Sequence, residues 1–437
     1  MTTSNTPIYA SQARPWLKFY DQKYIDQTMP ACTAFELVCR QNKNRLGETA
    51  LEYYGRKFTY ADFIVNVKKT AAALRAAGLK KGDIATVVSV MTPEIIFAFY
   101  AADMIGATLN LVDPRYSVEG IREYIEEVDS HLLICLNVVY ERCHQAAKRT
   151  HVEHVVVLSP ADSLPLPLAL GYKVKNLDKN KYHSNVIHWK QFLAAGKDES
   201  IAAEPYDPEH ACVVVHTGGT TGFPKGVMLT HYNVVNNGKA IGDCMDLSTA
   251  DKMMIQVPMF HCFGMVLAMT AAMTHGTTMC PIPAFSPKKG LDCINREQIT
   301  CFHGVPTMFI AMLGHPDFPN TDFSHMRTGI MAGSPCPIKV MQEVVEKMHM
   351  PEIVITYGQT EASPATTMSK ITDSIETRVN TVGSPIFGVE CKIVDPDTGE
   401  ELPDNTDGEF CARGYNIMKG YYKMPESTAV AIDKDGW

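Results

Sequence analysis

Residues 217–226 read Thr-Gly-Gly-Thr-Thr-Gly-Phe-Pro-Lys-Gly. The stretch before them, 211–216, and the stretch after them, 227–231, both have the apolar, β-branched character of strands. Glycines allow positive φ and leave backbone N–H groups bare, and successive N–H groups form a concavity that suits an anion. Threonine hydroxyls add donors and Lys225 adds a positive charge. The sequence therefore predicts a loop that binds phosphate and joins two strands.

The predicted phosphate ligands share donor groups or glycine backbone, and they are Thr217, Gly218, Gly219, Thr220, Thr221, Gly222 and Lys225. The loop is not a Walker loop, because that motif has its lysine directly after a glycine and opens a helix. Here Phe223 and Pro224 precede the lysine, and a strand is expected to follow. A Gly-rich hairpin with solvated hydroxyls is the simpler alternative, but the Pro-Lys-Gly ending favours a functional loop.

Strand and helix patterns alternate outward from this loop. Before it we expect a hairpin around 55–56, a helix over 60–77 with Thr59 as its N-cap, and then alternating elements up to 159. Residues 160–200 have little pattern and suggest an irregular excursion with one short helix at 189–195. After the loop, strands are expected at 255–258, 277–281, 301–305, 328–332 and 353–356, with helices between them.

This alternation predicts an α/β fold with two layered α/β subdomains built on mainly parallel sheets. From residue 380 short strands and turns dominate, which indicates a small antiparallel β-barrel subdomain. The expected boundaries are 1–205 for the first α/β subdomain, 206–379 for the second, and 380–437 for the barrel. Residues 253–287 contain no Asp, Glu, Lys or Arg, but prolines and glycines interrupt them. They predict a short buried helix at 264–275 rather than a membrane span.

Composition excludes several classes of protein. The 437 residues are 46% hydrophobic and 20% charged, with a formal net charge of -8 and no long basic run, so nothing indicates nucleic-acid binding. The 13 cysteines are scattered without a Cys-x-x-Cys pair. They predict small buried side chains in a reducing, cytoplasmic compartment rather than a zinc site.

Several motifs follow the loop in an order that resembles the adenylate-forming superfamily of acyl-CoA synthetases, luciferases and adenylation domains. They are Phe-His-Cys-Phe-Gly at 260–264, Gly-Ser-Pro at 333–335, Tyr-Gly-Gln-Thr-Glu at 357–361, and Asp-Gly-Trp at 435–437. The resemblance covers nearly the whole chain but only that family's large N-terminal domain. Its ribose-binding Asp and its mobile C-terminal domain with a catalytic lysine would come after residue 437, and we expect a shortened chain with little activity alone.

The resemblance implies a role for each matching position. Adenine and AMP would contact Gly333, Ser334, Pro335, Thr356, Tyr357, Gly358, Gln359 and Thr360. Thr360 would meet the α-phosphate, Glu361 would hold Mg²⁺, and His261 would lie beside the carboxylate and take part in gating. The acyl pocket would include Phe263, Gly264, Val305 and Gly333. For Val305 an ordinary helix start explains the sequence nearly as well, and an isolated His261 would be read as a core histidine.

The implied reaction uses ATP, Mg²⁺ and CoA to convert a carboxylic acid to an acyl-adenylate and then to a thioester. No acid stands in 260–263 to bind a substrate ammonium, and the following helix is uncharged, which favours fatty or aryl acids. The chain most resembles medium-chain fatty acyl-CoA synthetases. Two alternatives stay open: an adenylation module that loads a carrier protein, and a non-catalytic protein that binds a nucleotide or acyl group.

Overall fold

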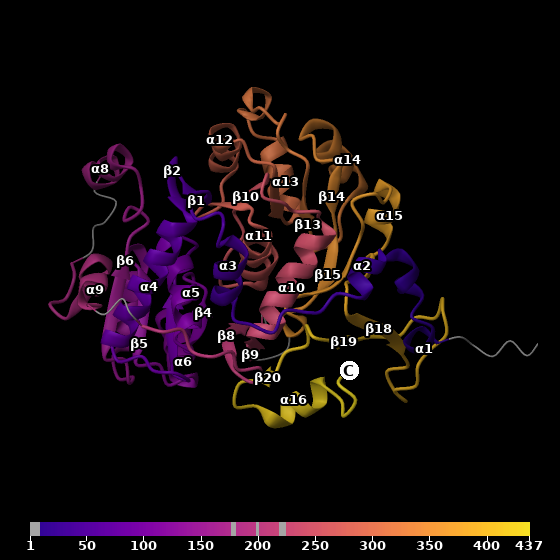
Figure 1. Ribbon diagram of the computed structural model, residues 1–437, viewed down its shortest axis with the longest axis horizontal. Coiled ribbons are helices and arrows are strands. Elements are labelled where there is room, and N and C mark those ends of the chain that lie inside the picture. Colours follow the sequence, from indigo (N-terminus) through magenta and orange to yellow (C-terminus); the bar gives the residue numbers. More distant parts are fainter. Residues whose placement is uncertain (1–8, 176–180, 198–200, 218–223) are drawn as a thin grey trace, which may run out of the picture.

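The computed structural model describes residues 9–175, 181–197, 201–217 and 224–437. Among these residues two large sheets lie side by side, the first formed mainly by the indigo-to-magenta strands in Figure 1 and the second by the brown-to-orange ones. The first sheet has the order β20 (Gly420–Tyr421), β9 (Gly226–Thr230), β8 (Ala211–His216), β4 (Thr108–Val112), β3 (Ile84–Val88), β5 (Leu132–Leu136), β6 (His154–Leu158) and β7 (Val186–His188). Only β9 runs antiparallel to its neighbours.

The second sheet is parallel except for its edge hairpin. Its order is β14 (Glu352–Val354), β13 (Thr328–Met331), β12 (Cys301–Gly304), β10 (Lys252–Ile255), β11 (Thr278–Pro281), β1 (Thr49–Tyr53) and β2 (Arg56–Thr59). The boundary expected at 205–206 does not separate the two sheets. Strands β1 and β2 precede it but belong to the second sheet, and strands β8 and β9 follow it but belong to the first. Strand β20, from beyond residue 380, also joins the first sheet.

Two helices show how local sequence sets the layers. Helix α4 (Tyr60–Ala76) begins with the expected capping box, in which Thr59 and Asp62 each bond the other's backbone N–H. Helix α10 (His231–Cys244) packs against the π-helix η3 (Phe263–Thr270) and α11 (Ala271–His275). The helix expected at 264–275 within the uncharged stretch is thus present and mostly buried, as η3 and α11. No helix in the described part of the chain is long and apolar enough to cross a membrane.

The other helices cover the sheets. They are α1 (Ala10–Ala13), α2 (Gln22–Ile25), α3 (Ala34–Asn42), α5 (Pro93–Met104), α6 (Val118–Glu127), α7 (Tyr140–Ala147), α8 (Leu166–Val174), α9 (Trp189–Ala195), α12 (Pro287–Glu297), α13 (Pro306–Leu313), α14 (Ile338–Lys347), α15 (Ile375–Asn380) and α16 (Pro425–Ala431). Five 3₁₀ or π segments carry η labels, and the 3₁₀ ones are η1 (Pro15–Phe19), η2 (Asn137–Val139), η4 (Phe318–Asn320) and η5 (Thr360–Ala362).

Two expectations need correction. Residues 160–200 contain helix α8 and strand β7 besides the expected helix α9. Pro165 and Pro167 suggested irregular chain, but they lie at the start of α8, where proline costs no hydrogen bond. The strand expected at 255–258 is β10, which ends at Ile255 because its ladder with β11 and β12 spans residues 252–255 and Pro258 offers no N–H.

Small antiparallel sheets complete the fold. One contains β15 (Thr356–Gly358), β16 (Ala365–Met368) and β17 (Ser384–Pro385), and the other contains β18 (Val389–Val394) and β19 (Glu409–Gly414). The strand expected at 353–356 is therefore divided between two sheets, with β14 in the large one and β15 in a small one. The expectation of an α/β fold with mainly parallel sheets and a small antiparallel unit is confirmed.

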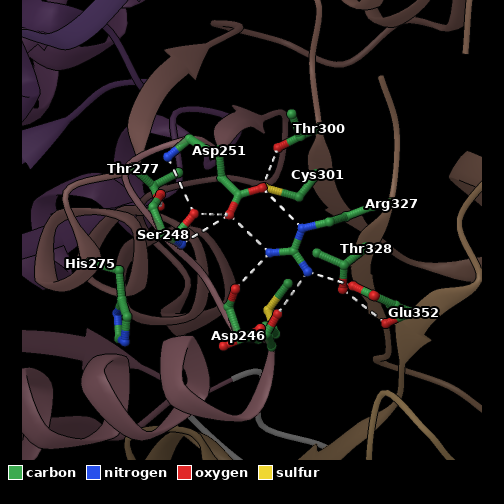
Figure 2. Close-up of polar contacts among 12 residues, drawn as sticks. Asp246, Ser248, Asp251, His275, Thr277, Thr300, Cys301, Arg327, Thr328 and Glu352 are labelled. Carbon is green, nitrogen blue, oxygen red and sulfur yellow. Dashed lines mark hydrogen bonds and ion pairs between the residues drawn. The ribbon is translucent and has the colours of Figure 1, made fainter. Parts of the chain in front are cut away.

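A polar network joins the amino ends of the second sheet (Figure 2). Arg327, directly before β13, donates from Nε to Asp251 Oδ1 at 3.1 Å and from Nη2 to Asp251 Oδ2 at 2.9 Å, and it also pairs with Glu352. Thr300 donates to the same aspartate at 2.8 Å. These residues precede or begin β10, β12, β13 and β14, so the network aligns the strands, and their opposite, carboxyl ends meet at one edge.

This network predicts a stability that depends on pH. Burial opposes ionisation of Asp251, but hydrogen bonds from Arg327 and Thr300 hold its pKa below the ordinary value. Asp251→Asn should lower the free energy of unfolding by about 3 kcal/mol near neutral pH, because Arg327 loses its charged partner. Since the folded-state pKa is depressed, this contribution is complete above the unfolded pKa of about 3.9 and disappears as pH falls through the folded value.

Urea unfolding of both proteins between about pH 7 and pH 3 measures the difference. Glu343→Gln is the matched control, because it removes a carboxylate from a partly exposed pair with Lys347 on α14, and such surface pairs contribute little to stability. An Asp251→Asn cost as small as that of the control would contradict the role of the network.

Candidate active site

The predicted phosphate loop lies between antiparallel strands β8 and β9, as expected. Gly218, Gly219, Thr220, Thr221 and Gly222 lie outside the described residues. The two ends of the loop are described and bond each other. Thr217 N donates to Lys225 O at 3.1 Å, and Lys225 N donates to Thr217 Oγ1 at 3.2 Å. A strand follows the lysine, which distinguishes the loop from a Walker loop.

Side chains of α6 fix the base of this loop. His216 Nε2 lies 2.9 Å from Glu127 Oε2, and the imidazole packs on Tyr124 at 4.1 Å between ring centroids. A Cβ on Gly226 would lie 3.0 Å from Glu127 Oε1, so only glycine fits beside this pair without displacing it. Sequence analysis did not find His216 or Glu127, because 89 residues separate them.

The turn with Thr360 and Glu361 forms η5, which directly follows β15. Glu361 accepts two hydrogen bonds from the segment before and within β20. Met418 N donates to its backbone oxygen at 2.8 Å, and the Tyr421 hydroxyl donates to Oε1 at 2.7 Å. The ammonium of Lys225 lies over the ring of Tyr421, 4.7 Å from its centroid. The structure thus brings the predicted lysine and glutamate to opposite parts of one tyrosine.

The residues predicted to bind adenine lie on either side of this turn. The side chain of Tyr357 is 45% exposed and meets Phe410 edge-on, with ring centroids 5.4 Å apart. The Thr356 hydroxyl donates to Thr367 O at 2.7 Å and so is used inside the small sheet. A cavity of about 450 Å³ is bordered by Tyr357, Gly358, Gln359 and Glu361 together with β19 and the end of the chain.

A larger cavity, of about 720 Å³, lies beside α8 and is lined by Tyr172, Tyr182 and Trp189 among others. None of the predicted site residues borders it. Size alone therefore does not identify the site, and the smaller cavity is the candidate because Glu361 and three residues predicted to bind adenine border it, together with Tyr421, which contacts Lys225.

The turn after β13 contains Gly333, Ser334 and Pro335, whose side chains or backbone are exposed. Gly333 has φ +85°, and a Cβ there would lie 3.1 Å from Val305 Cγ1. The structure therefore brings together two of the residues predicted for the acyl pocket. Both follow neighbouring parallel strands, β12 and β13, at the carboxyl edge where open α/β sheets bind ligands.

His261 lies where β10 passes into η3. Its Nδ1 accepts from Phe263 N at 3.1 Å, and although the ring reaches solvent, partial burial lowers its pKa. A Cβ on Gly264 would lie 2.3 Å from Pro258 O, so this position requires glycine. Phe263 is buried and stacks on His303, with centroids 5.9 Å apart. Phe263 and Gly264 thus form the base of this region rather than an exposed surface.

His303 is a residue to which sequence analysis gave no role of its own. Its Nε2 lies 2.8 Å from Leu267 O, and its Nδ1 accepts from Ile330 N at 3.1 Å. These contacts require a neutral ring with its proton on Nε2. Complete burial lowers the pKa of His303 to about 4. A neutral histidine therefore joins η3 to β13 directly behind Phe263.

A single carboxylate in this region suits one kind of metal. Where the structure describes the chain, it contains no cluster of three or more His, Cys, Asp or Glu residues able to hold an ion by themselves. Mg²⁺ does not need such a cluster, because one or two carboxylates plus substrate phosphates usually hold it. Glu361, close to the end of the phosphate loop, fits that arrangement.

Comparison with known proteins identifies the family. Residues 38–422 match the AMP-binding enzyme family, and the chain therefore belongs to it. The protein YngI of Bacillus subtilis (strain 168) is 39% identical over 390 residues, which are 87% of this chain and 70% of that protein. The medium-chain acyl-CoA ligase ACSF2, mitochondrial, of Bos taurus is 31% identical, with 87% and 63% covered. The chain thus spans about two thirds of the length of these relatives.

Solved structures agree with this assignment. Apo MatB from Rhodopseudomonas palustris superposes with a TM-score of 0.78 at 25% identity, over 92% of this chain and 74% of that one. The N-terminal domain of FACL13 from Mycobacterium tuberculosis has the same fold, with a TM-score of 0.75 at 20% identity. That likeness covers 93% of this chain and 94% of that one.

The buried histidine gives a second pH prediction. Because the folded-state pKa of His303 lies near 4 and the unfolded value near 6.5, the unfolded chain binds more protons between them. The free energy of unfolding should therefore rise with pH across this window, by on the order of 3 kcal/mol from this residue. His303→Asn should lose that slope, as measured by chemical denaturation at several pH values. The control His349→Asn, at an exposed position, should keep it.

Proposed function

We propose that the chain forms the adenylate site of an ATP-dependent, AMP-forming acyl-CoA synthetase whose substrate is a medium-chain fatty acid. One observation carries the proposal: Lys225 and Glu361 lie on opposite parts of Tyr421, beside the cavity bordered by Tyr357. A cation for phosphates, a carboxylate for a metal and an aromatic for a base are the groups that nucleotide activation needs in one place.

The proposed reaction has two steps. In the first, a carboxylate oxygen of the acid attacks the α-phosphorus of ATP, the bond to the β-phosphate oxygen breaks, and pyrophosphate leaves. In the second, the CoA thiol attacks the acyl carbonyl, loses its proton, and expels AMP. Both steps depend on positioning and on neutralising charge, because the reacting groups are anionic.

Each residue has a place in this scheme. Lys225 neutralises the departing phosphates at the end of the loop, and Thr360 contacts the α-phosphate. Tyr357 covers one face of adenine, with Gly333–Pro335 on the other. Glu361 would hold Mg²⁺, which when bound neutralises phosphate charge. His261, whose lowered pKa favours a neutral ring, lies beside the carboxylate without adding a charge there.

The substrate class rests on the surroundings of that carboxylate. Helix η3 is uncharged and buried throughout, and the apolar side chain of Val305 lies against Gly333. Two relatives in the comparison carry names that fit, the medium-chain ligase ACSF2 of Bos taurus and of Danio rerio. The 13 cysteines are all free, which is in keeping with a reducing compartment such as the cytoplasm.

A polypeptide of these 437 residues is expected to bind its ligands yet form thioester slowly. The reason is the family resemblance, in which the catalytic lysine belongs to a domain that follows the Asp-Gly-Trp motif. Rapid release of acyl-CoA by this polypeptide alone would contradict that part of the proposal.

Nucleotide binding tests the proposed site. Lys225→Met should weaken the binding of MgATP by roughly 10-fold or more, because a hydrogen bond between charged groups is lost. The same change should alter AMP binding by no more than about twofold, since AMP lacks the outer phosphates. Isothermal calorimetry of both ligands provides the comparison. Lys347→Met, on α14, is the matched control. An equal loss of affinity for ATP and for AMP in Lys225→Met would contradict the assignment of Lys225 to the outer phosphates.

A further inference from the structure

We infer that Tyr421 is a positioning residue that holds the metal-binding carboxylate of Glu361 and the phosphate-binding ammonium of Lys225 apart and ready for MgATP; this inference rests on the proposed function. The family resemblance assigned no role to Tyr421. The contacts of its hydroxyl, ring and backbone carry the argument.

The backbone of Tyr421 is attached to the strand that leaves the phosphate loop. Strand β20 pairs antiparallel with β9, with Tyr421 opposite Val227. Two further hydrogen bonds extend the pairing, from Lys419 N to Met228 O at 3.0 Å and from Tyr422 N to Gly226 O at 2.7 Å. Because Gly226 directly follows Lys225, these bonds tie residues 420–422 to the end of the loop.

The other side of Tyr421 is fixed as firmly. Its N–H donates to Thr428 Oγ1 at 2.9 Å, in the middle of α16. A Cβ on Gly420 would lie 2.8 Å from Thr428 Cγ2, so glycine is required for this close approach. The Tyr421 side chain is buried, at 7% exposure. A side chain restrained in this way loses little further entropy when it orients its neighbours.

The hydroxyl of Tyr421 orients the carboxylate. It donates to Glu361 Oε1 at 2.7 Å, while Met418 N holds the backbone oxygen of the same residue at 2.8 Å. One carboxylate oxygen is thereby bonded to protein, and among the described residues the other oxygen accepts no hydrogen bond, which leaves it available to a cation. Partners that hydrogen-bond to a metal ligand fix its direction and commonly change metal affinity.

The ring of Tyr421 occupies the space beside the ammonium. Lys225 Nζ lies 4.7 Å from its centroid, in the geometry of a cation–π contact. Lys225 and Glu361 have opposite charges and share this one neighbour, yet the structure gives the ammonium an aromatic face instead of the carboxylate. A direct ion pair would have to break before MgATP could bind, whereas a cation–π contact and a neutral hydroxyl leave both charges available.

Two substitutions distinguish the contribution of the Tyr421 hydroxyl from that of its ring. Tyr421→Phe keeps the ring and removes only the bond to Glu361, whereas Tyr421→Leu removes both contacts. Tyr422→Phe is the matched control, because it removes a hydroxyl from the adjacent tyrosine, whose ring contacts Lys423 instead. All are tested in the 437-residue chain by calorimetric titration with ATP, with and without Mg²⁺.

Tyr421→Phe should raise the Mg²⁺ concentration that gives half-maximal ATP binding by roughly 3- to 10-fold, the effect of one hydrogen bond. Its affinity for ATP without Mg²⁺ should stay within about twofold of that of the unsubstituted chain. Tyr421→Leu should lower the affinity for ATP both with and without Mg²⁺, because Lys225 is then free to pair with Glu361. In a Glu361→Gln background, Tyr421→Phe should have little further effect on the Mg²⁺ requirement, since the two residues act together.

Three results would overturn the inference. An unchanged Mg²⁺ requirement in Tyr421→Phe would show that the hydroxyl does not orient the metal ligand. An equal loss of ATP affinity with and without Mg²⁺ in Tyr421→Phe would show that the tyrosine only stabilises the fold. Failure of the unsubstituted chain to bind MgATP would overturn the proposed function and this inference with it, whereas normal MgATP binding beside an unaltered Tyr421→Phe would overturn this inference alone.

Discussion

The pairing of β20 with β9 is the constraint on which the candidate site depends. Two hydrogen-bonded residue pairs place Tyr421 beside Lys225, although 196 positions separate them in the chain. The turn with Glu361 joins the same point through Met418 and the Tyr421 hydroxyl. Three segments distant in sequence thus meet through a strand of only two residues. Strand β9 also contacts η5 directly, and β20 adds the tyrosine that touches both the lysine and the carboxylate.

In the second sheet, buried polar contacts hold the strands at both of their ends. Arg327 and Asp251 join the strands at their amino ends, while His303 joins η3 to β13 close to their carboxyl ends. Both sets of buried polar groups have partners, which is the condition under which such groups stabilise a single arrangement. The turns that carry Val305 and Gly333 therefore leave a sheet that these contacts hold at both ends.

Local sequence was sufficient for much of this structure. The capping box at Thr59 and the helix over residues 338–347 follow from local signals, and the phosphate loop was recognisable from its glycines, hydroxyls and lysine. The turns at 333–335 and 357–361 were identified from the resemblance to a family. In the structure the first turn follows β13, the second spans the end of β15 and η5, and the contacts of both with ligands remain predictions.

Other features could not be read from the sequence. The exchange of β1, β2, β8 and β9 between the sheets depends on pairing between distant strands, which no local pattern specifies. Helix α8 was missed because Pro165 and Pro167 also suit irregular chain. Tyr421 and His303 were not assigned roles, because a role for either requires knowing what lies across from it in space.

The most direct test of the account is thermal unfolding of the chain with non-hydrolysable acyl-adenylate mimics of graded acyl length, aryl mimics included. A mimic at about 100 times its Kd should add ~2.7 kcal/mol to the free energy of unfolding. The account predicts a maximum shift for mimics with medium-length alkyl chains, because one site holds both the nucleotide and the acyl group. No shift with any mimic, at concentrations that saturate related enzymes, would contradict the claim that these residues form an adenylate site.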